Sequence, residues 1–235
     1  MKLDNAIVLV TGANRGIGLA FAREALARGA RKVYAGARDP GKVLLPGVEP
    51  VRLDVTRAED VAAAVERCRD VTLVVNNAGI ASPGGFLATD SIEAARAMME
   101  TNFFGVMRVS AAFAPVLAAN GGGALLNVLS IASWISTPGL GAYASTKSAA
   151  WSLTNGLRQE LRAQGTQVLG LHMGFVDTDL TSGFDAAKER PEDIVRRAFD
   201  ALEAGREEVR ADEITQKVKD GLSADPGPYL SAIKR

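Results

Sequence analysis

The sequence predicts an α/β fold in which a parallel sheet is covered by helices on both faces. Strand and helix patterns alternate along all 235 residues, and no linker or low-complexity segment interrupts them. The run at residues 71–75 is β-branched and apolar apart from Thr72, which is typical of a parallel strand buried on both faces. A glycine-rich turn directly follows the first strand. We therefore expect one doubly wound domain over residues 1–235 with about seven strands.

The expected strands are short apolar runs, at residues 8–11, 32–36, 51–53, 71–75, 124–129, 167–171 and 207–210. The expected helices begin at Gly16, after the capping-box pair Thr56 and Glu59, at Asp90, near Tyr143 and at Pro191. The helix from Asp90 extends to the glycines at 121–123, and Pro115 is expected to kink or break it. Because prolines and a glycine cluster at 225–228, residues 221–235 are expected to form an irregular tail.

Composition limits the partners. Lys+Arg and Asp+Glu both number 27, so no net field favours nucleic acid or an anionic membrane, and a small molecule is the expected partner. The apolar run at residues 6–11 is too short for a signal peptide or a membrane span, which favours a cytoplasmic protein. Cys68 and His172 are each the only residue of their type. We expect Cys68 to pack in the core, and we expect no metal site.

The glycine-rich turn predicts a phosphate site. Gly12, Gly16 and Gly18 lie between a strand and a helix, where free N–H groups and the helix dipole attract anions. The spacing fits neither the usual dinucleotide fingerprint nor a P-loop, so a purely structural turn is the alternative. Arg38 follows Gly18 by 20 positions, where an acidic residue would bind a ribose hydroxyl and an Arg accommodates a 2′-phosphate. Arg15 is either a second phosphate ligand or a solvated charge.

Tyr143 and Lys147 are the candidates for acid–base chemistry. Four residues apart at the start of a helix, they share a face, and the ammonium is expected to lower the pKa of the phenol. Ser130 ends a strand thirteen positions before Tyr143, where its hydroxyl can face the same cleft. The alternative is a solvent-exposed Tyr–Lys pair without function. For Trp134 and Trp151, core packing or a subunit contact is expected rather than substrate stacking.

Several segments together resemble the short-chain dehydrogenases/reductases, in order and in spacing, from about residue 5 to residue 180. They are Thr11-Gly12-Ala13-Asn14-Arg15-Gly16-Ile17-Gly18, Asp54-Val55, Asn76-Asn77-Ala78-Gly79, Asn102, Asn127-Val128-Leu129-Ser130, Tyr143-Ala144-Ser145-Thr146-Lys147 and Gly174-Phe175-Val176-Asp177-Thr178. Each motif is ordinary, but their conjunction is specific. The resemblance implies a Rossmann-type fold that binds NAD(P), and with Arg38 present the phosphorylated form, NADP(H), is expected.

The resemblance also implies roles for individual residues. The catalytic tetrad would be Asn102, Ser130, Tyr143 and Lys147. Ser130 would hydrogen-bond the substrate oxygen, Tyr143 would exchange a proton with it, and Lys147 would hold the nicotinamide ribose. Asn102 would anchor a water that relays protons to Lys147. The cofactor would contact the glycine-rich turn, Arg38, Asp54 and Val55 near the adenine, and Tyr143, Lys147, Gly174, Val176 and Thr178 near the nicotinamide. Residues 76–79, among them Asn76, Ala78 and Gly79, would line the adenosine ribose and stabilise the sheet.

One motif departs from the family pattern, because Met173 stands where the family usually has Pro before Gly174. Losing the fixed φ of proline is expected to loosen that loop slightly. The substrate segment at about 179–191 is short, which predicts an open cleft for bulky or hydrophobic carbonyl compounds. The resemblance implies a homodimer or homotetramer built on the long helices. The leading hypothesis is a carbonyl/alcohol oxidoreductase; the alternatives are an epimerase or dehydratase of the same family and a non-catalytic dinucleotide sensor.

Overall fold

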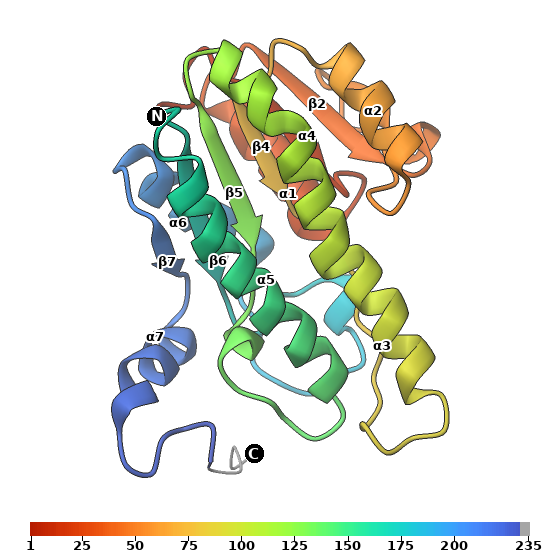
Figure 1. The fold of residues 1–235 in the computed structure, drawn as a ribbon, viewed down its shortest axis with the longest axis vertical. Helices are drawn as coiled ribbons and strands as arrows, with labels where there is room; N and C mark the ends of the chain where they lie inside the picture. The colour runs from red at the N-terminus through yellow and green to blue at the C-terminus, as the bar shows by residue number, and fades with distance from the viewer. Residues whose placement is uncertain (231–235) are drawn as a thin grey trace.

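The sheet has seven parallel strands in the order β3-β2-β1-β4-β5-β6-β7, as shown by a computed structural model that describes residues 1–230. The strands are β1 (Ile7–Thr11), β2 (Lys32–Ala37), β3 (Glu49–Arg52), β4 (Leu73–Asn76), β5 (Ala124–Val128), β6 (Gln167–His172) and β7 (Glu208–Arg210). The order changes direction between β1 and β4, so the carboxyl ends of these two strands lie side by side (Figure 1). This is the expected Rossmann-type, doubly wound fold.

Helices cover both faces of the sheet (Figure 1). The helices α1 (Gly16–Ala27) and α6 (Pro191–Glu203) pack in one core cluster with one face. The helices α2 (Ala58–Arg67), α4 (Val106–Ala119) and α5 (Gly141–Glu160) pack in a second cluster with the other face. The strands supply both clusters by alternation: Val8 and Val10 of β1 face the first, whereas Ile7 and Leu9 face the second. This explains why the strands are apolar at nearly every position.

The long helix expected from Asp90 is interrupted at Asn102 rather than at Pro115. It consists of α3 (Ser91–Met99), a π-helical segment (Glu100–Gly105) and α4, and Pro115 lies inside α4 without ending it. Pro115 therefore does not break the helix, and a kink at this residue, the other expectation, stays a prediction. Asn102 binds outside its own helix, and such a side-chain requirement is a common setting for a π-bulge.

Within residues 1–230, Ser91–Ala119 is the helical stretch that is long and apolar enough to span a membrane. Its buried side chains include Met98, Val109 and Phe113, which are removed from solvent against the rest of the protein. Arg108 forms an ion pair with Glu100 at 2.8 Å across the helix surface. A buried apolar stripe opposite a charged face is typical of the core helix of a globular fold.

One other local expectation was wrong, and one helix had no prediction. The Thr56–Glu59 capping box does not form, because α2 begins at Ala58 and its N-cap is Arg57, with no side-chain cap. Thr56 instead donates both its N–H and its hydroxyl to the carboxylate of Asp54. A helix without a sequence prediction, α7 (Glu213–Asp220), precedes the tail. The tail begins with a 3₁₀ turn at Gly221–Ser223, and its residues 231–235 lie outside the described part.

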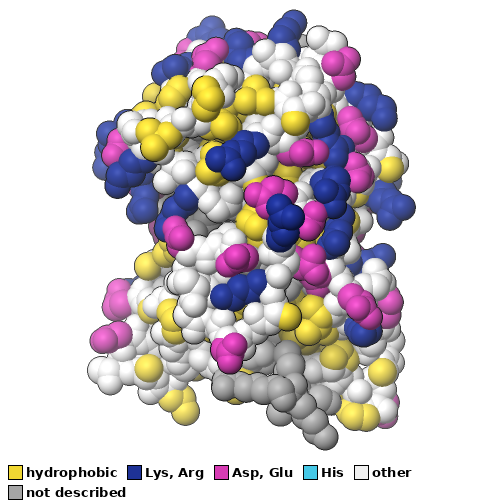
Figure 2. Space-filling model, turned by 180° about the vertical axis from the view of Figure 1, so that it is seen from behind, with side chains coloured by type: hydrophobic (Ala, Val, Ile, Leu, Met, Phe, Trp, Pro, Cys, Tyr) yellow, Lys and Arg dark blue, Asp and Glu magenta, His cyan; other side chains and the backbone are white. Residues whose placement is uncertain are grey.

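The surface carries interspersed charges of both signs. Figure 2 shows Lys and Arg side chains intermixed with Asp and Glu across one face of the molecule. Some of these charges join elements, since Arg28, the C-cap of α1, pairs with Glu24 at 2.7 Å and with Asp200 and Glu203 of α6 at 2.8 and 3.3 Å. These pairs support the packing of α1 against α6.

Candidate active site

A cleft of about 600 Å³ opens at the carboxyl edge of the sheet, where the strand order changes direction. Open α/β sheets bind their ligands at this position. The cleft brings together all of the predicted site residues except Asn76 and Asn102. Those that line it are Gly12, Asn14, Arg15, Gly16, Ile17, Gly18, Arg38, Asp54, Val55, Ala78, Gly79, Ser130, Tyr143, Lys147, Gly174, Val176 and Thr178.

The glycine-rich turn has the conformation that an anion site requires. Gly12 and Gly16 have φ angles of +66° and +55°, which glycine adopts without strain. A Cβ on Gly12 would lie 3.1 Å from the Cα of Ala78. The helix α1 begins at Gly16 with no side-chain cap and no acidic residue in its first turn, so its first N–H groups are free to bind an anion. The turn therefore fits the pyrophosphate of a dinucleotide.

Thr11 joins this turn to the loop after β4, a role that no sequence pattern indicated. Its hydroxyl accepts hydrogen bonds from the N–H groups of Asn77 and Ala78, each at 2.9 Å. The Asn77 amide donates in return to the carbonyls of Thr11 and Gly12 at 2.9 and 3.2 Å. The loops after β1 and β4 therefore form one hydrogen-bonded unit at the floor of the cleft.

Asn76 does not line the cleft, contrary to the prediction. Its side chain is buried, and its Nδ2 donates to the Ser110 hydroxyl at 3.0 Å and to Asn127 Oδ1 at 2.8 Å. Successive side chains of a strand point to opposite faces, so Asn76 faces β5 and α4 while Asn77 faces the glycine-rich turn. Asn76 therefore holds the sheet and its covering helix together below the site, which agrees with the sheet-stabilising role that the resemblance implied.

Asn102 also lies behind the cleft wall rather than in it. Its Oδ1 accepts from the N–H of Ile80 at 2.9 Å, and its Nδ2 donates to the Ile80 carbonyl at 2.8 Å and to the Thr146 hydroxyl at 3.0 Å. The side chain thus fixes the loop after β4 to the turn of α5 that carries Lys147. A water relay from Asn102 to Lys147 stays a prediction.

Charged groups gather at the end of the cleft near β2 and β3. This end is lined by Arg38, Asp39, Lys42 and Asp54. Lys42 is a second positive charge beside Arg38, and the sequence analysis did not predict it. Burial alone would raise the pKa of the Asp54 carboxyl. Hydrogen bonds from Thr56 and the positive charge of Arg38 outweigh burial and lower that pKa. Asp54 is therefore ionised at neutral pH and accepts hydrogen bonds.

Arg15 forms an ion pair across the mouth of the cleft. Its Nη1 lies 2.7 Å from Asp179 Oδ2, and both side chains are largely exposed. Exposed pairs of this kind contribute about 0–1 kcal/mol, so a phosphate could compete for the guanidinium. The pair links the glycine-rich turn to the 3₁₀ turn at Asp179–Thr181, 164 positions away in the sequence.

Ser130, Tyr143 and Lys147 meet on the other side of the cleft. Ser130 follows β5 and caps the 3₁₀ turn Ile131–Ser133 by accepting from the N–H of Ala132 at 3.1 Å. Tyr143 and Lys147 lie in the first two turns of α5. The Lys147 ammonium donates to the Val128 carbonyl at 2.8 Å and lies 5.8 Å from the centre of the Tyr143 ring. A hydroxyl, a phenol and an ammonium therefore face one cavity.

The expected lowering of the Tyr143 pKa is not what this structure gives. Burial raises the pKa of Tyr143 to about 12, although a hydrogen bond from Ser130 opposes the shift. Burial also lowers the pKa of Lys147 to about 8. Lys147 directs its ammonium at the Val128 carbonyl instead of the phenol, so desolvation governs both groups. Tyr143 is therefore a protonated donor at neutral pH, beside an ammonium that remains mostly charged.

The loop with Met173 in place of the usual proline is anchored by hydrogen bonds on both sides, and its expected slight loosening stays a prediction. Met173 is buried in the core, and its carbonyl accepts from the N–H of Ile131 at 2.8 Å. The N–H of Gly174 donates to Asp212 Oδ2 at 2.6 Å, while Asp212 Oδ1 accepts from Thr215 and caps α7. Asp212 has no sequence signal, because it lies 38 positions from its partner.

The segment after Thr181 folds back onto residues 175–177. Phe184 packs on Phe175 with ring centres 5.2 Å apart, and Glu189 exchanges backbone hydrogen bonds with Phe175 and Asp177. Of the predicted substrate segment at 179–191, only Asp179, Leu180 and Thr181 line the cleft. Residues 182–190 therefore form a small closed loop beside the site.

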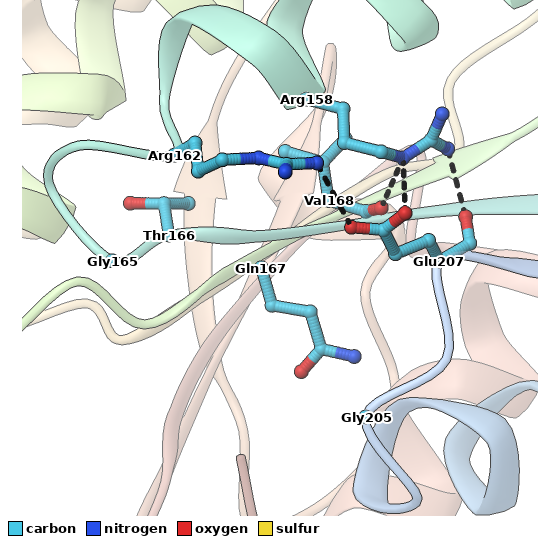
Figure 3. A pocket seen from close by; sticks show the side chains of 8 residues that line it. All are labelled: Arg158, Arg162, Gly165, Thr166, Gln167, Val168, Gly205 and Glu207. Carbon is cyan, nitrogen blue, oxygen red and sulfur yellow. Dashed lines mark hydrogen bonds and ion pairs between the residues drawn. The ribbon is translucent and has the colours of Figure 1, made fainter.

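Other parts of the described chain offer no comparable site. A second cavity of about 310 Å³ lies at the opposite, amino edge of the sheet (Figure 3). Its Arg158 donates to the carbonyls of Val168 and Glu207, and the Glu207 carboxylate faces both Arg158 and Arg162. Burial raises the pKa of Cys68 to about 12, so that thiol is unreactive. Residues 1–230 contain no cluster of three metal-binding side chains.

Comparisons with known proteins identify the family. A model of the short chain dehydrogenase family matches residues 6–189. An uncharacterized oxidoreductase of Staphylococcus saprophyticus is 30% identical over 232 residues, which cover 92% of this chain and 98% of the relative. Galactitol 2-dehydrogenase (L-tagatose-forming) of Cereibacter sphaeroides is 36% identical over 202 residues, covering 81% and 78%.

A crystal structure of a short chain dehydrogenase from Burkholderia cenocepacia in complex with NADP is 38% identical. It superposes with a TM-score of 0.92 over 96% of both chains. The chain therefore belongs to the short-chain dehydrogenase/reductase family. It is an oxidoreductase that uses a nicotinamide dinucleotide, NAD(P).

Proposed function

We propose that this protein is an NADP(H)-dependent reductase that interconverts a carbonyl compound and an alcohol, working as a single domain in the cytoplasm. The observation that carries the proposal is the meeting of Ser130, Tyr143 and Lys147 in the same cleft as an uncapped, glycine-rich helix start. A proton donor beside a dinucleotide site suits carbonyl reduction better than binding alone, because a sensor needs no proton donor.

The protein's own residues supply proton transfer and orientation, while the nicotinamide, when bound, supplies or accepts the hydride. In reduction, the Ser130 hydroxyl hydrogen-bonds the substrate oxygen and Tyr143 donates its phenolic proton to that oxygen. The proton and the hydride together convert the carbonyl to an alcohol. The pKa of Lys147, about 8, keeps its ammonium mostly charged at neutral pH. That charge stabilises the phenolate that Tyr143 becomes.

The preference for the phosphorylated cofactor rests on Arg38 and Lys42. Both cations line the end of the cleft near β2, where the family binds the adenosine ribose. Asp39 also lines this end. Its carboxylate accepts a hydrogen bond from the N–H of Gly41 at 3.0 Å and is therefore engaged within its own turn. We assign the adenine edge to Asp54 and Val55, and the nicotinamide amide to Gly174, Val176 and Thr178. Arg15 would bind the 2′-phosphate if it left its ion pair with Asp179.

The substrate is proposed to be a bulky or hydrophobic carbonyl compound. Leu180 lines the cleft and is 46% exposed, and Ile214, which is 53% exposed, contacts the Gly174 position. Phe86, 58% exposed, lies against Gly141, two residues before Tyr143. We propose that these three side chains form an apolar rim at the cleft opening; Leu180 lines the cleft itself, and residues 182–190 are not part of its lining. A larger apolar substrate would bury more of this rim and bind more tightly.

Assembly into a homodimer or homotetramer is proposed through the α3–α4 surface. Ile92, Phe104 and Met107 are between 46% and 66% exposed there, and contiguous exposed apolar side chains favour association between copies. Light scattering at micromolar concentration should give at least twice the mass of the chain. A monomer mass would contradict this assembly.

A spectrophotometric screen tests the proposed function. Purified protein is mixed with NADPH or NADH and with ketones, imines and quinones of increasing size. We expect NADPH oxidation with ketones, with kcat/KM rising as apolar carbons are added beyond the smallest members. Absence of turnover with every carbonyl compound would contradict the reductase assignment. A steady fall of kcat/KM with substrate size would contradict the open cleft while leaving the reductase assignment intact.

A further inference from the structure

The last turn of α7 is attached to the back of the catalytic loop through one lysine. The Lys219 Nζ lies 4.6 Å from the ring centre of Trp134 and 5.0 Å from that of Trp151. The two indoles meet edge to face, with centres 6.2 Å apart and ring planes at 90°. The Lys219 side chain is only 24% exposed, and partial removal from water strengthens the attraction of an ammonium to aromatic rings. Lys219 is therefore held in an aromatic cage formed by Trp134 and Trp151.

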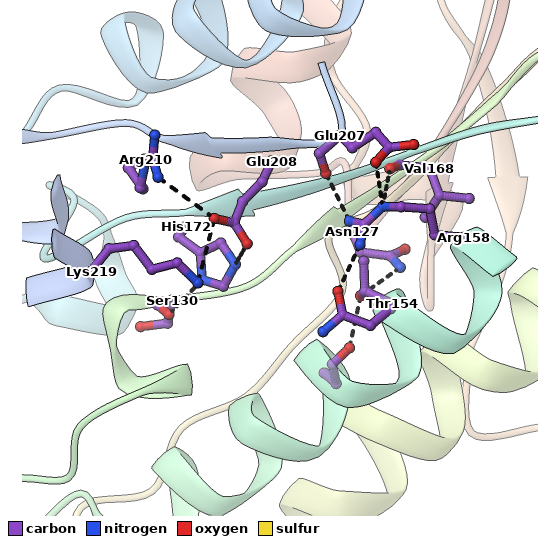
Figure 4. Close-up of polar contacts among 12 residues, drawn as sticks. Asn127, Ser130, Thr154, Arg158, Val168, His172, Glu207, Glu208, Arg210 and Lys219 are labelled. Carbon is purple, nitrogen blue, oxygen red and sulfur yellow. Dashed lines mark hydrogen bonds and ion pairs between the residues drawn. The ribbon is translucent and has the colours of Figure 1, made fainter. Parts of the chain in front are cut away.

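A carboxylate closes the cage on the side of the sheet. Glu208 of β7 lies 3.7 Å from the Lys219 ammonium, and its other oxygen lies 3.7 Å from His172 Nε2 (Figure 4). Arg210 approaches the same carboxylate at 3.9 Å. The opposite charges favour the docked position of Lys219. Four elements thus meet here: the loop after β5, α5, β7 and α7.

The cage continues directly to Ser130. The Trp134 ring stacks on the His172 imidazole, with centres 4.0 Å apart and planes at 20°. His172 Nδ1 lies 3.1 Å from the Ser130 carbonyl, so the nitrogen that faces this acceptor carries the proton. Ser130 and Trp134 are also the N-cap and the C-cap of one 3₁₀ turn. His172 and Lys219 therefore fix the two ends of the turn that presents the serine.

His172 holds its contact in one protonation state. The imidazole is fully buried, and burial lowers its pKa to about 3. It therefore stays neutral throughout the range in which the enzyme works. The single histidine, for which no sequence pattern predicted a role at the site, thus contacts the backbone of Ser130.

We propose that Lys219 is a positioning residue: from outside the cleft, its ammonium holds Trp134 against His172 and so fixes the turn that carries Ser130. The inference rests on the proposed function in one respect, namely that Ser130 binds the reacting oxygen. Lys219 is not among the residues that line the cleft. Its loss should therefore lower the rate of the chemical step without weakening dinucleotide binding at the glycine-rich turn.

The chain offers matched variants for a test. Lys219→Met keeps the length of the side chain and removes its charge, and Lys219→Arg keeps a cation. Lys217→Met is the control, because Lys217 lies on the same helix, is 72% exposed and pairs with Glu213 at 2.7 Å instead of with the cage. The sequence contains two tryptophans, both of which form the cage, so fluorescence excited selectively at tryptophan, rather than at the three tyrosines, reports on this site.

The expected result is specific to the charge at position 219. In Lys219→Met, acrylamide quenching of tryptophan fluorescence should rise about twofold because the cage opens more often. The kcat for carbonyl reduction should fall roughly three- to tenfold. The KM for NADPH should stay within about twofold of wild type in this variant. Lys219→Arg should recover most of kcat, and Lys217→Met should match the wild type in both measurements.

Three results would overturn the proposal. Unchanged kcat in Lys219→Met, with altered quenching, would show that the cage does not act on Ser130. An equal loss of kcat in Lys217→Met, or a parallel loss of NADPH binding, would indicate general loosening of α7. A wild-type protein that turns over no carbonyl compound would overturn the proposed function together with this inference, whereas the first two results leave the proposed function standing.

Discussion

The two sides of the cleft are built in different ways. On the pyrophosphate side, the binding surface is a tight turn made within residues 11–18, with glycine φ angles and free helix N–H groups. On the nicotinamide and substrate side, the surface is held by side chains from distant parts of the chain. Asp212 binds Gly174, and His172 binds the Ser130 carbonyl 42 positions away.

This difference predicts how each side responds to mutation. The pyrophosphate side depends on backbone conformation, so one wrong side chain there should remove binding outright. The nicotinamide side depends on several separate polar contacts, so the loss of one should reduce activity by a limited factor. Lys147 lies on the nicotinamide side, and burial sets its pKa.

Gly12→Val should have the largest effect on cofactor binding. Valine is strained at a φ of +66°, and its Cβ would lie 3.1 Å from the Ala78 Cα. We expect NADPH affinity to fall by more than about 100-fold, measured by calorimetric titration. The control is Gly205→Val, which has a φ of +72° but no neighbour within 4 Å and lies outside the cleft. Normal NADPH affinity in Gly12→Val would show that the turn does not bind the cofactor.

Lys147→Met should change the pH dependence of stability. The pKa of Lys147 falls from 10.5 in the unfolded chain to about 8 in the folded protein because burial penalises its charge. Below pH 8 both states are protonated, and the folded state carries the full penalty, up to about 3 kcal/mol. Between pH 8 and 10.5 the folded state loses its proton first, so this penalty disappears as the pH rises.

The measurement is urea unfolding of wild type and Lys147→Met at pH 7 and at pH 10. The free energy of unfolding of the wild type should increase relative to that of the variant between these values. Comparing the two proteins cancels the contributions of Cys68 and Tyr143, which both retain. A difference that does not change with pH would contradict the desolvation of Lys147.

Arg38→Ala should alter cofactor preference. A charge-assisted bond to phosphate contributes roughly 1.5–3 kcal/mol, so the preference of kcat/KM for NADPH over NADH should fall by about ten- to a hundredfold. Lys42→Ala should cause a smaller change in the same direction. Equal kcat/KM values for NADPH and NADH in the wild type would show that neither cation contacts the 2′-phosphate.

Asp212→Asn should have the smallest effect. The amide still accepts from Gly174, but the charge that strengthens this 2.6 Å bond is lost. We expect kcat/KM to decrease about three- to tenfold, in steady-state assays. Asp220→Asn, at the other end of α7, is the control because Asp220 binds only the exposed Gln216. A hundredfold loss of kcat/KM in Asp212→Asn would mean that the nicotinamide side, like the glycine-rich turn, does not tolerate the loss of a single contact.

The same difference explains which parts of the fold and of the site could be predicted from the sequence. Strands such as β1 were predictable because burial on both faces demands apolar residues at every position. The residues around the cleft were found through spacing within motifs and through a family resemblance. Asn76 was misplaced because neighbouring strand positions face opposite ways, which a motif does not record.

What the sequence did not reveal depends on contacts between distant segments. The π-helical segment forms where Asn102 reaches Ile80, and Pro115 gave a misleading local signal. The roles of Thr11 and Asp212 follow from partners 66 and 38 positions away. The direction of the Tyr143 pKa depends on burial, which the four-residue spacing to Lys147 does not reveal.

Tyr143→Phe tests the central claim most directly. Loss of a general acid should lower kcat for carbonyl reduction by about 10²–10⁴-fold, while the Kd for NADPH stays within about threefold because the glycine-rich turn is untouched. Tyr229→Phe is the control, since Tyr229 is 56% exposed and does not line the cleft. Near wild-type kcat in Tyr143→Phe, with normal NADPH binding, would contradict the assignment of Tyr143 as the proton donor.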